Sequence, residues 1–314
     1  MKKIMTLLSI FGMSTAANAD EPVELRTGII LDQSSQTVVA MLPEKGITAI
    51  DVTSGETKWS SAIADKPLVI KNGQILSQQQ VNKKGLLALV YQSVSNGSVT
   101  NTVEVNLPRD VMANVVNTTG TDFKIAMNQA SQGNQLEWSF RGKKVRGAAP
   151  DVDELINQGV NLSSSEPGIK TGFIGIDFNN AAATTSATNI TRNKNSRAIE
   201  QRVLPQITGR QFLSQDGKHV LASVRVPSDR EMKYNWGIYT RSGELLSSLP
   251  ADYSYAPFVV TGNLMLFIAP ETGRVVDNKL TNNAPMLTAI NLQNQQKVWQ
   301  NAVRSTKYFG QLPQ

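Results

Sequence analysis

The chain has 314 residues, of which 40% are hydrophobic, with 31 basic and 25 acidic side chains and no cysteine. The absence of cysteine excludes disulfides, a thiolate nucleophile and a cysteine-ligated metal site. The positive charge is small and scattered, which argues against a nucleic-acid-binding protein. The fold must therefore be stabilised by core burial, for which a chain of this length is sufficient.

The first 19 residues have the pattern of a secretory signal peptide. Lys2 and Lys3 give a basic start, residues 4–13 form a short apolar run, and residues 17–19 offer small side chains to signal peptidase. A membrane-spanning helix needs about 20 apolar residues, and this run is shorter. We expect cleavage after Ala19, a mature protein that is neither membrane-spanning nor lipid-anchored, and a periplasmic location, with full secretion as the alternative.

Most of the remaining chain alternates apolar and polar residues in short runs, which predicts an all-β fold. Residues that tolerate turn geometry bound each run. The predicted strands are 37–42, 46–52, 68–70, 86–91, 99–107, 123–127, 173–178, 219–226, 237–240, 258–260, 264–268, 287–292 and 297–303. A single helix is predicted at 150–159. Its acidic first turn, Asp151, Asp153 and Glu154, fits a helix N-terminus better than a calcium site.

Residues 141–202 differ in composition, and 181–196 are nearly devoid of large apolar side chains. Such a stretch buries too little apolar surface to offset its ordering entropy. We predict one domain, 20–314, with a long polar insertion at about 141–202 around a strand pair at 173–178. The basic residues of this insertion are candidates for binding an acidic protein or anionic lipid headgroups, with a solvated loop as the alternative. They are Arg141, Lys143, Lys144, Arg146, Arg192, Lys194, Arg197 and Arg202.

The most specific pattern is a strand–turn–strand unit that ends in tryptophan. Residues 46–59 contain an alternating strand, a turn with Gly55 and a returning strand that reaches Trp59. Residues 287–299 repeat this design, with Ala289 and Trp299 spaced as Ala49 and Trp59 are. Weaker copies contain Gly133 with Trp138, the Asn96-Gly97 turn, and Gly243. A blade of this length cannot bury both faces alone, so the repeats predict closure into a β-propeller of four-stranded blades, five to seven in number.

These residues resemble the PQQ-like β-propeller repeat, whose pattern Ala49, Asp51, Gly55 and Trp59 match. The resemblance implies that Trp59, Trp138 and Trp299 pack between neighbouring blades. Residues 212–222 resemble the strand-entry turn of TolB-type and WD-like blades. Small PQQ-like propellers of this kind resemble the scaffold subunit of the outer-membrane β-barrel assembly machine. That subunit type carries a lipid anchor, for which this chain has no cysteine.

No residue pattern in the chain indicates catalysis. Quinoprotein dehydrogenases resemble the same repeat but carry a vicinal cysteine pair over their cofactor, so no quinone cofactor is expected. His219 is the only histidine; in a predicted strand after Asp216 it is more typical of a packed or surface residue than of a base or metal ligand. Nucleophile-elbow, phosphate-loop and dinucleotide-binding motifs are missing from the sequence.

We therefore predict a non-enzymatic periplasmic scaffold, without cofactor or metal, that binds a protein partner in an envelope assembly or secretion complex. The alternative is an enzyme or small-ligand-binding propeller with a site at the central channel.

Overall fold

The computed structural model describes residues 21–79, 87–107, 122–127, 134–141, 169–185, 189–191, 202–226, 233–251, 254–269, 272–276 and 279–304. Within these ranges the chain consists of strands, turns and irregular segments, with no helix. The prediction of an all-β chain built from antiparallel four-stranded sheets is thereby confirmed. The predicted signal peptide and the predicted helix at 150–159 lie outside the described residues. No helix of the described residues is long and apolar enough to cross a membrane.

The strands form five large sheets, which we name A to E, and one two-stranded ribbon. Sheet A contains β1 (Val23–Arg26), β2 (Ile29–Asp32), β3 (Thr37–Leu42), β4 (Gly46–Asp51) and β5 (Thr57–Ser61). Sheet B contains β6 (Lys66–Lys71), β7 (Gln74–Gln78), β8 (Leu87–Ser93) and β9 (Val99–Val105). Sheet C contains β10 (Asp122–Met127), β11 (Gln135–Arg141), β12 (Ile169–Asp177), β13 (Ala182–Thr185) and β14 (Asn189–Thr191).

Sheet D contains β15 (Gln211–Leu213), β16 (His219–Val226), β17 (Lys233–Thr240) and β18 (Leu245–Pro250). Sheet E contains β19 (Phe258–Thr261), β20 (Leu264–Ala269), β23 (Met286–Asn291) and β24 (Lys297–Ala302), and the ribbon of β21 (Thr272–Val276) and β22 (Lys279–Asn283) lies between β20 and β23 in sequence. Apart from this ribbon and from β14, which pairs with β12, each strand pairs with the next along its sheet.

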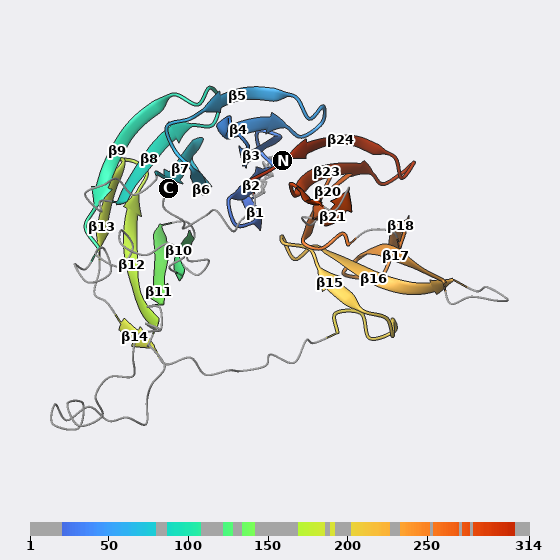
Figure 1. Ribbon diagram of the computed structural model, residues 1–314. Helices are drawn as coiled ribbons and strands as arrows, with labels where there is room; N and C mark the ends of the chain where they lie inside the picture. Colours follow the sequence, from blue (N-terminus) through green and yellow to red (C-terminus); the bar gives the residue numbers. More distant parts are fainter. Residues whose placement is uncertain are drawn as a thin grey trace, which may run out of the picture.

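The five sheets stand side by side in a curved row, in the order D, E, A, B, C, so that sheets C and D form its ends (Figure 1). Their apolar cores lie at the seams between neighbouring sheets. One core cluster joins D to E, one joins E to A, one joins A to B and one joins B to C. No core cluster of the described residues joins C to D.

The alternation of side chains along a strand explains how one sheet contributes to the cores on both of its faces. Successive side chains of a strand point to opposite faces. In sheet E, Leu266 and Ala289 belong to the core shared with sheet A, whereas their neighbours Met265 and Ile290 belong to the core shared with sheet D. The inner strands are therefore apolar on both faces.

The predicted insertion at 141–202 includes part of a sheet. Strand β12 pairs with β11, and both β13 and β14 pair with β12, so three strands of sheet C come from this range. The predicted strand at 173–178 falls within β12 and the residue that follows it. The polar stretch 181–196 contains β13 and β14 as well.

Candidate functional site

The same turn precedes the last strand in three of the sheets. It begins at Asp51 in sheet A, at Asp177 in sheet C and at Asn291 in sheet E. Each of these side chains accepts hydrogen bonds, at 2.8–3.3 Å, from the backbone N–H groups two and three residues later. The N–H of Ser54 is the main cause that lowers the pKa of Asp51. Side-chain acceptors of this kind stabilise turns locally.

The fifth residue of the turn has a left-handed backbone. The φ angles are +74° at Gly55, +72° at Gly97, +45° at Ala181 and +61° at Gln295. The sequence pattern predicted turns near 55, 97 and 295, and the structure adds the equivalent turn at Ala181. Gly243 also has a positive φ, +94°, in a turn that is one residue shorter.

A β-bulge follows this turn in sheets A, B, D and E. In each outermost strand one residue has no partner opposite it: Lys58, Thr100, Leu246 or Val298. A bulge bends the strand and re-aims the next side chain. Strand β13 of sheet C pairs with β12 without such a shift.

The residue after the bulge ties its sheet to the next sheet of the row. Trp299 of sheet E donates its indole N–H to the carbonyl of Val52 in sheet A, at 2.7 Å. Trp59 of sheet A donates in the same way to Val94 of sheet B, at 2.7 Å. The Trp299 ring lies directly against Gly55, where a Cβ atom would overlap it, and Trp59 lies against the equivalent glycine of sheet B.

Two other side chains take the tryptophan position. Ser247 of sheet D donates to the carbonyl of Leu292 in sheet E, at 2.8 Å. Asn101 of sheet B donates to the carbonyl of Ala181 in sheet C, at 2.8 Å. All four seams therefore use one device: a bulge, a polar donor after it, and a turn carbonyl of the next sheet. We call this device the seam tie.

The repeat residues predicted from the sequence occupy different places in this device. Ala49 and Ala289 lie opposite Trp59 and Trp299 in the strand pairs. Trp299 is buried, whereas Trp59 is half-buried. Trp138 is also buried, in the core shared by B and C, but it lies on the second strand of its sheet and packs over Gly172. It is therefore no part of a seam tie. Gly133 lies outside the described residues.

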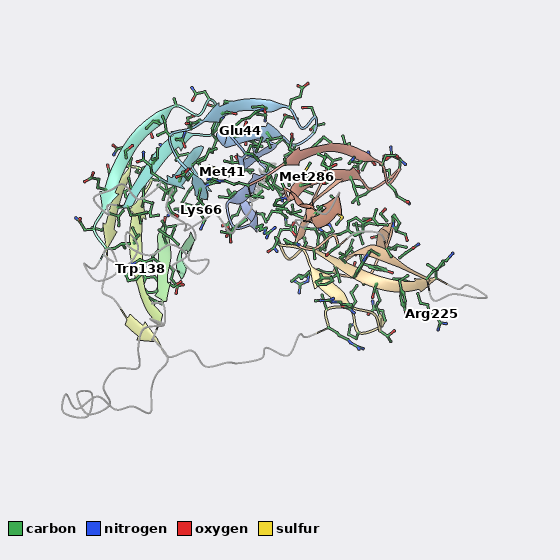
Figure 2. The ribbon with its side chains drawn as sticks, viewed as in Figure 1. Met41, Glu44, Lys66, Trp138, Arg225 and Met286 are labelled. Carbon is green, nitrogen blue, oxygen red and sulfur yellow. The ribbon has the colours of Figure 1, made fainter. Side chains whose placement is uncertain are left out.

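Most of the predicted basic site lies outside the described residues, namely Lys143, Lys144, Arg146, Arg192, Lys194 and Arg197. Arg141 ends β11, and Arg202 is exposed before β15. Sheet D carries basic residues that the sequence pattern did not single out, with Arg225 at its far tip (Figure 2). These are Arg210, Lys218, Arg225, Lys233 and Arg241. Arg225 and Lys233 lie on β16 and β17, whereas Arg210, Lys218 and Arg241 lie just outside the strands, which is why no run of charges marks them in the sequence.

The only histidine of the chain, His219, begins β16 directly after a turn. Ser214 donates its hydroxyl to Asp216 at 2.5 Å and accepts the backbone N–H of His219 at 2.8 Å. Burial lowers the pKa of His219, and the charge of Asp216 opposes that change. The N–H of Gln215 donates to the carbonyl of Phe258, which attaches the turn to sheet E. These contacts give the turn a structural role.

A second group of charges lies on inner strands at the concave side of the row, where Lys66 is visible in Figure 2. The Lys66 side chain is buried and donates to the carbonyl of Ile125 in sheet C, at 2.7 Å. Burial raises the pKa of Glu24, while the positive charge of Lys66 acts to lower it. Asp65, next to Lys66, pairs with Arg304 at 3.8 Å. No group of three or more metal-ligating side chains occurs among the residues that the structure describes.

No protein-family model and no curated protein matches the chain. Solved structures with related shapes include a europium-containing methanol dehydrogenase, at 8% identity and a TM-score of 0.29, with 86% of this chain and 60% of that chain covered. Hydrazine synthase of Kuenenia stuttgartiensis matches at 11% identity and a TM-score of 0.23, with coverage of 90% and 66%. The β-propeller domain of Myceliophteria thermophila Cps50 matches at 10% identity and a TM-score of 0.27, with 74% of this chain and 76% of that chain covered. The chain thus spans less than two thirds of the first two proteins, and at these scores no function follows from the similarity.

Proposed function

We propose that the protein is an exported β-propeller of the periplasm that binds a protein partner and acts as a scaffold without catalysing a reaction. The four-stranded sheets then correspond to blades, five of which are described, and closure of the row makes the propeller. The seam ties support this proposal because they hold neighbouring blades in a fixed relation, which suits a rigid presenting surface.

One observation carries the interaction function. The large hydrophobic residues exposed in the described chain are unevenly distributed, and most of them lie on sheet D. They are Leu213, Tyr234, Leu245 and Leu246 on sheet D, with Ile63, Val99 and Val298 elsewhere. Exposed apolar groups gathered on one element mark interaction sites more often than scattered ones do.

The test is affinity capture from periplasmic extract with the tagged mature protein and two double variants. Leu245→Ser with Leu246→Ser alters sheet D, and Ile63→Ser with Val298→Ser is the matched control for loss of exposed apolar surface. A partner captured by wild type and control and lost from the sheet D variant supports the proposal. Capture that is equal for all three would place binding elsewhere.

Export is tested on the same preparation. Because Ala17 and Ala19 fit the signal peptidase pocket, we expect the mature N-terminus at Asp20, read by intact mass. A periplasmic protein that retains residues 1–19 would contradict the proposed processing.

A second function, small-ligand binding at the first strands of sheets A and B, is favoured by the charges of Glu24 and Lys66 there, because burial raises the pKa of Glu24. Perturbed titratable groups concentrate at functional sites, although ion pairs that only stabilise the fold produce them too. A thermal-shift screen with small carboxylates and phosphate tests this function. A stabilising ligand whose effect disappears in Lys66→Met would support it, whereas no stabilisation by any of these anions would count against it.

A further inference from the structure

The sequence contains two Asn-Gly dipeptides, Asn72-Gly73 and Asn96-Gly97, and both lie in turns of sheet B. In such a pair the backbone nitrogen of the glycine can approach the side-chain amide carbon of the asparagine, because glycine has no Cβ atom to obstruct it. Asparagine is accordingly one of the thermolabile residues of proteins. Both asparagines are exposed, so exposure alone does not distinguish them.

The turn at Asn96 restrains every group that this reaction would use. The N–H of Gly97 donates to the carbonyl of Ser93 at 2.9 Å. The side-chain oxygen of Asn96 accepts the N–H of Ser98 at 3.0 Å. The ring of Trp59 lies against Gly97, where a Cβ atom would overlap it. Attack at Asn96 therefore requires the loss of two hydrogen bonds and the displacement of a ring.

The turn at Asn72 has no such restraint from the residues that the structure describes. It is the two-residue connection between β6 and β7, with φ angles of +50° at Asn72 and +70° at Gly73, a turn geometry that favours this dipeptide. Nothing lies within 4 Å of the place that a Cβ atom would take at Gly73. Among the described residues, no hydrogen bond involves the Asn72 side chain or the Gly73 N–H.

We propose that Asn72 is a site of spontaneous deamidation in the folded protein, whereas the seam tie between sheets A and B protects Asn96. The backbone nitrogen of Gly73 bonds to the side-chain amide carbon of Asn72, and its proton leaves with the amide nitrogen as ammonia. Water then opens the resulting cyclic imide at either of its carbonyl carbons. The product has aspartate or isoaspartate at position 72, and water is the only co-reactant.

The position of this turn connects the modification to the seam between sheets A and B. The carbonyl of Gly73 accepts the N–H of Val94 at 2.9 Å, and the carbonyl of Val94 accepts the indole N–H of Trp59 at 2.7 Å. Val94 is buried in the core that the two sheets share. Isoaspartate lengthens the main chain of the turn by a methylene group and adds a charge. We expect it to displace the Gly73 carbonyl and to weaken this seam.

The wild-type mature protein provides the first test, without any substitution. Folded and denatured samples are incubated at mildly alkaline pH, and peptide mass spectrometry follows the conversion of amide to acid at both sites. In the folded protein we expect Asn72 to react at least about tenfold faster than Asn96, because two hydrogen bonds must open at Asn96. In denaturant the two rates should agree within about twofold, since both residues precede glycine. Equal rates in the folded protein, or a faster reaction at Asn96, would overturn the proposal.

The products test the imide route. Incubation in water enriched in oxygen-18 should place the heavy isotope in the new acid at position 72, and isoaspartyl methyltransferase should detect isoaspartate there. Aspartate without isoaspartate would mean that water hydrolyses the side chain directly, and the participation of Gly73 would then be wrong.

The protective role of the ring is tested with Trp59→Ala, which uncovers Gly97. We expect the reaction at Asn96 to accelerate at least about threefold, because the turn then opens more easily. Trp299→Ala removes the equivalent ring at another seam and is the matched control, with no change expected at Asn96. Circular dichroism checks the folding of both variants, and Trp59→Leu replaces Trp59→Ala if the latter is unfolded. An unchanged rate at Asn96 in the folded variant would contradict protection by the ring.

The effect on the seam is measured by thermal melting of fresh and incubated protein. We expect wild type to melt a few degrees lower once Asn72 has been converted. Asn72→Gln is the control, because glutamine would have to form a larger ring and reacts far more slowly, so its melting temperature should not change on incubation. Wild type that melts unchanged after conversion would overturn the effect on the seam. None of these measurements involves a partner, so their outcome is independent of the proposed scaffold function.

Discussion

In sheet E, Val260 is buried against sheet D, whereas Leu213, at the equivalent position of sheet D, is 43% exposed. The two sheets have the same strand order and the same bulge, and each donates a hydrogen bond to the next sheet through the residue after that bulge. They differ in the donor, which is serine in sheet D and tryptophan in sheet E, in the length of the turn, and in what lies on the other face. Burial at a seam is therefore a property of the pair of sheets, and the same strand pattern can be either a core or a surface.

The largest effect is expected at the seam between E and A. Trp299→Ala removes a buried ring and its hydrogen bond to Val52, so we expect a loss of about 3–5 kcal/mol in the free energy of unfolding. Trp59→Ala should cost less because that ring is half-buried. Denaturant unfolding of both variants measures the difference. Equal stability of Trp299→Ala and wild type would show that the seam tie contributes nothing.

A glycine substitution tests the acceptor side of the same seam. Gly55→Ala places a methyl group on the Trp299 ring and a side chain at a positive φ, so we expect about 2–4 kcal/mol of destabilisation. Gly73 also has a positive φ, +70°, but open space around it. Gly73→Ala is therefore the matched control, with about 1–2 kcal/mol expected from the backbone alone. Equal losses in the two variants would argue against close packing of ring on glycine.

The sequence predicted the sheets better than it predicted their seams. Thirteen strands were expected, and each overlaps an observed strand, because alternation and turn residues are local signals. Short polar strands were missed, such as β13 and β14, since neither alternates strongly. Strand β13 of sheet C lies within the range that was predicted to be an insertion. The turn before it has Ala181 at the left-handed position, so a pattern that looks for glycine there does not detect it.

The basic residues of sheet D were predictable only in part. Arg202 was predicted because it ends a basic stretch of the sequence, but Arg210, Arg225 and Arg241 are far apart in the sequence and belong to one sheet only through strand pairing. The exposure of Leu213 could not be predicted from the sequence either. Val260 holds the equivalent position on the first strand of sheet E, and the two residues differ in whether a neighbouring sheet covers them.

At the D–E seam the donor is Ser247, so the contribution of the hydrogen bond to stability can be measured there without the loss of a buried ring. Ser247→Ala removes the 2.8 Å hydrogen bond to Leu292 and leaves that carbonyl without this donor. We expect a loss of about 1 kcal/mol, a typical net contribution of a hydrogen bond. Ser248→Ala, the next residue of the same strand, serves as the control because it removes only a long hydrogen bond from Asn235, at 3.5 Å. If both variants unfold at the same denaturant concentration as wild type, the polar donor of this seam is dispensable and apolar packing alone holds sheet D.

The smallest effect is expected at the inner strands, where charge contributes in place of a seam tie. Burial raises the pKa of Glu24 in the folded protein, and the charge of Lys66 and the N–H of Gly28 only partly offset this. A carboxyl whose folded pKa lies above its unfolded value favours the folded state at low pH, and this contribution is lost as pH rises through the folded pKa. Glu24→Gln removes the ionisation, so the variant should melt slightly higher than wild type at pH 7. The difference should disappear below about pH 4, where glutamate is largely protonated in both states. Melting temperatures of both proteins between pH 3.5 and 8 measure this dependence.

A variant that melts lower than wild type at pH 7 would mean that attraction to Lys66 outweighs burial, and the inner strands would then be held together by the ion pair.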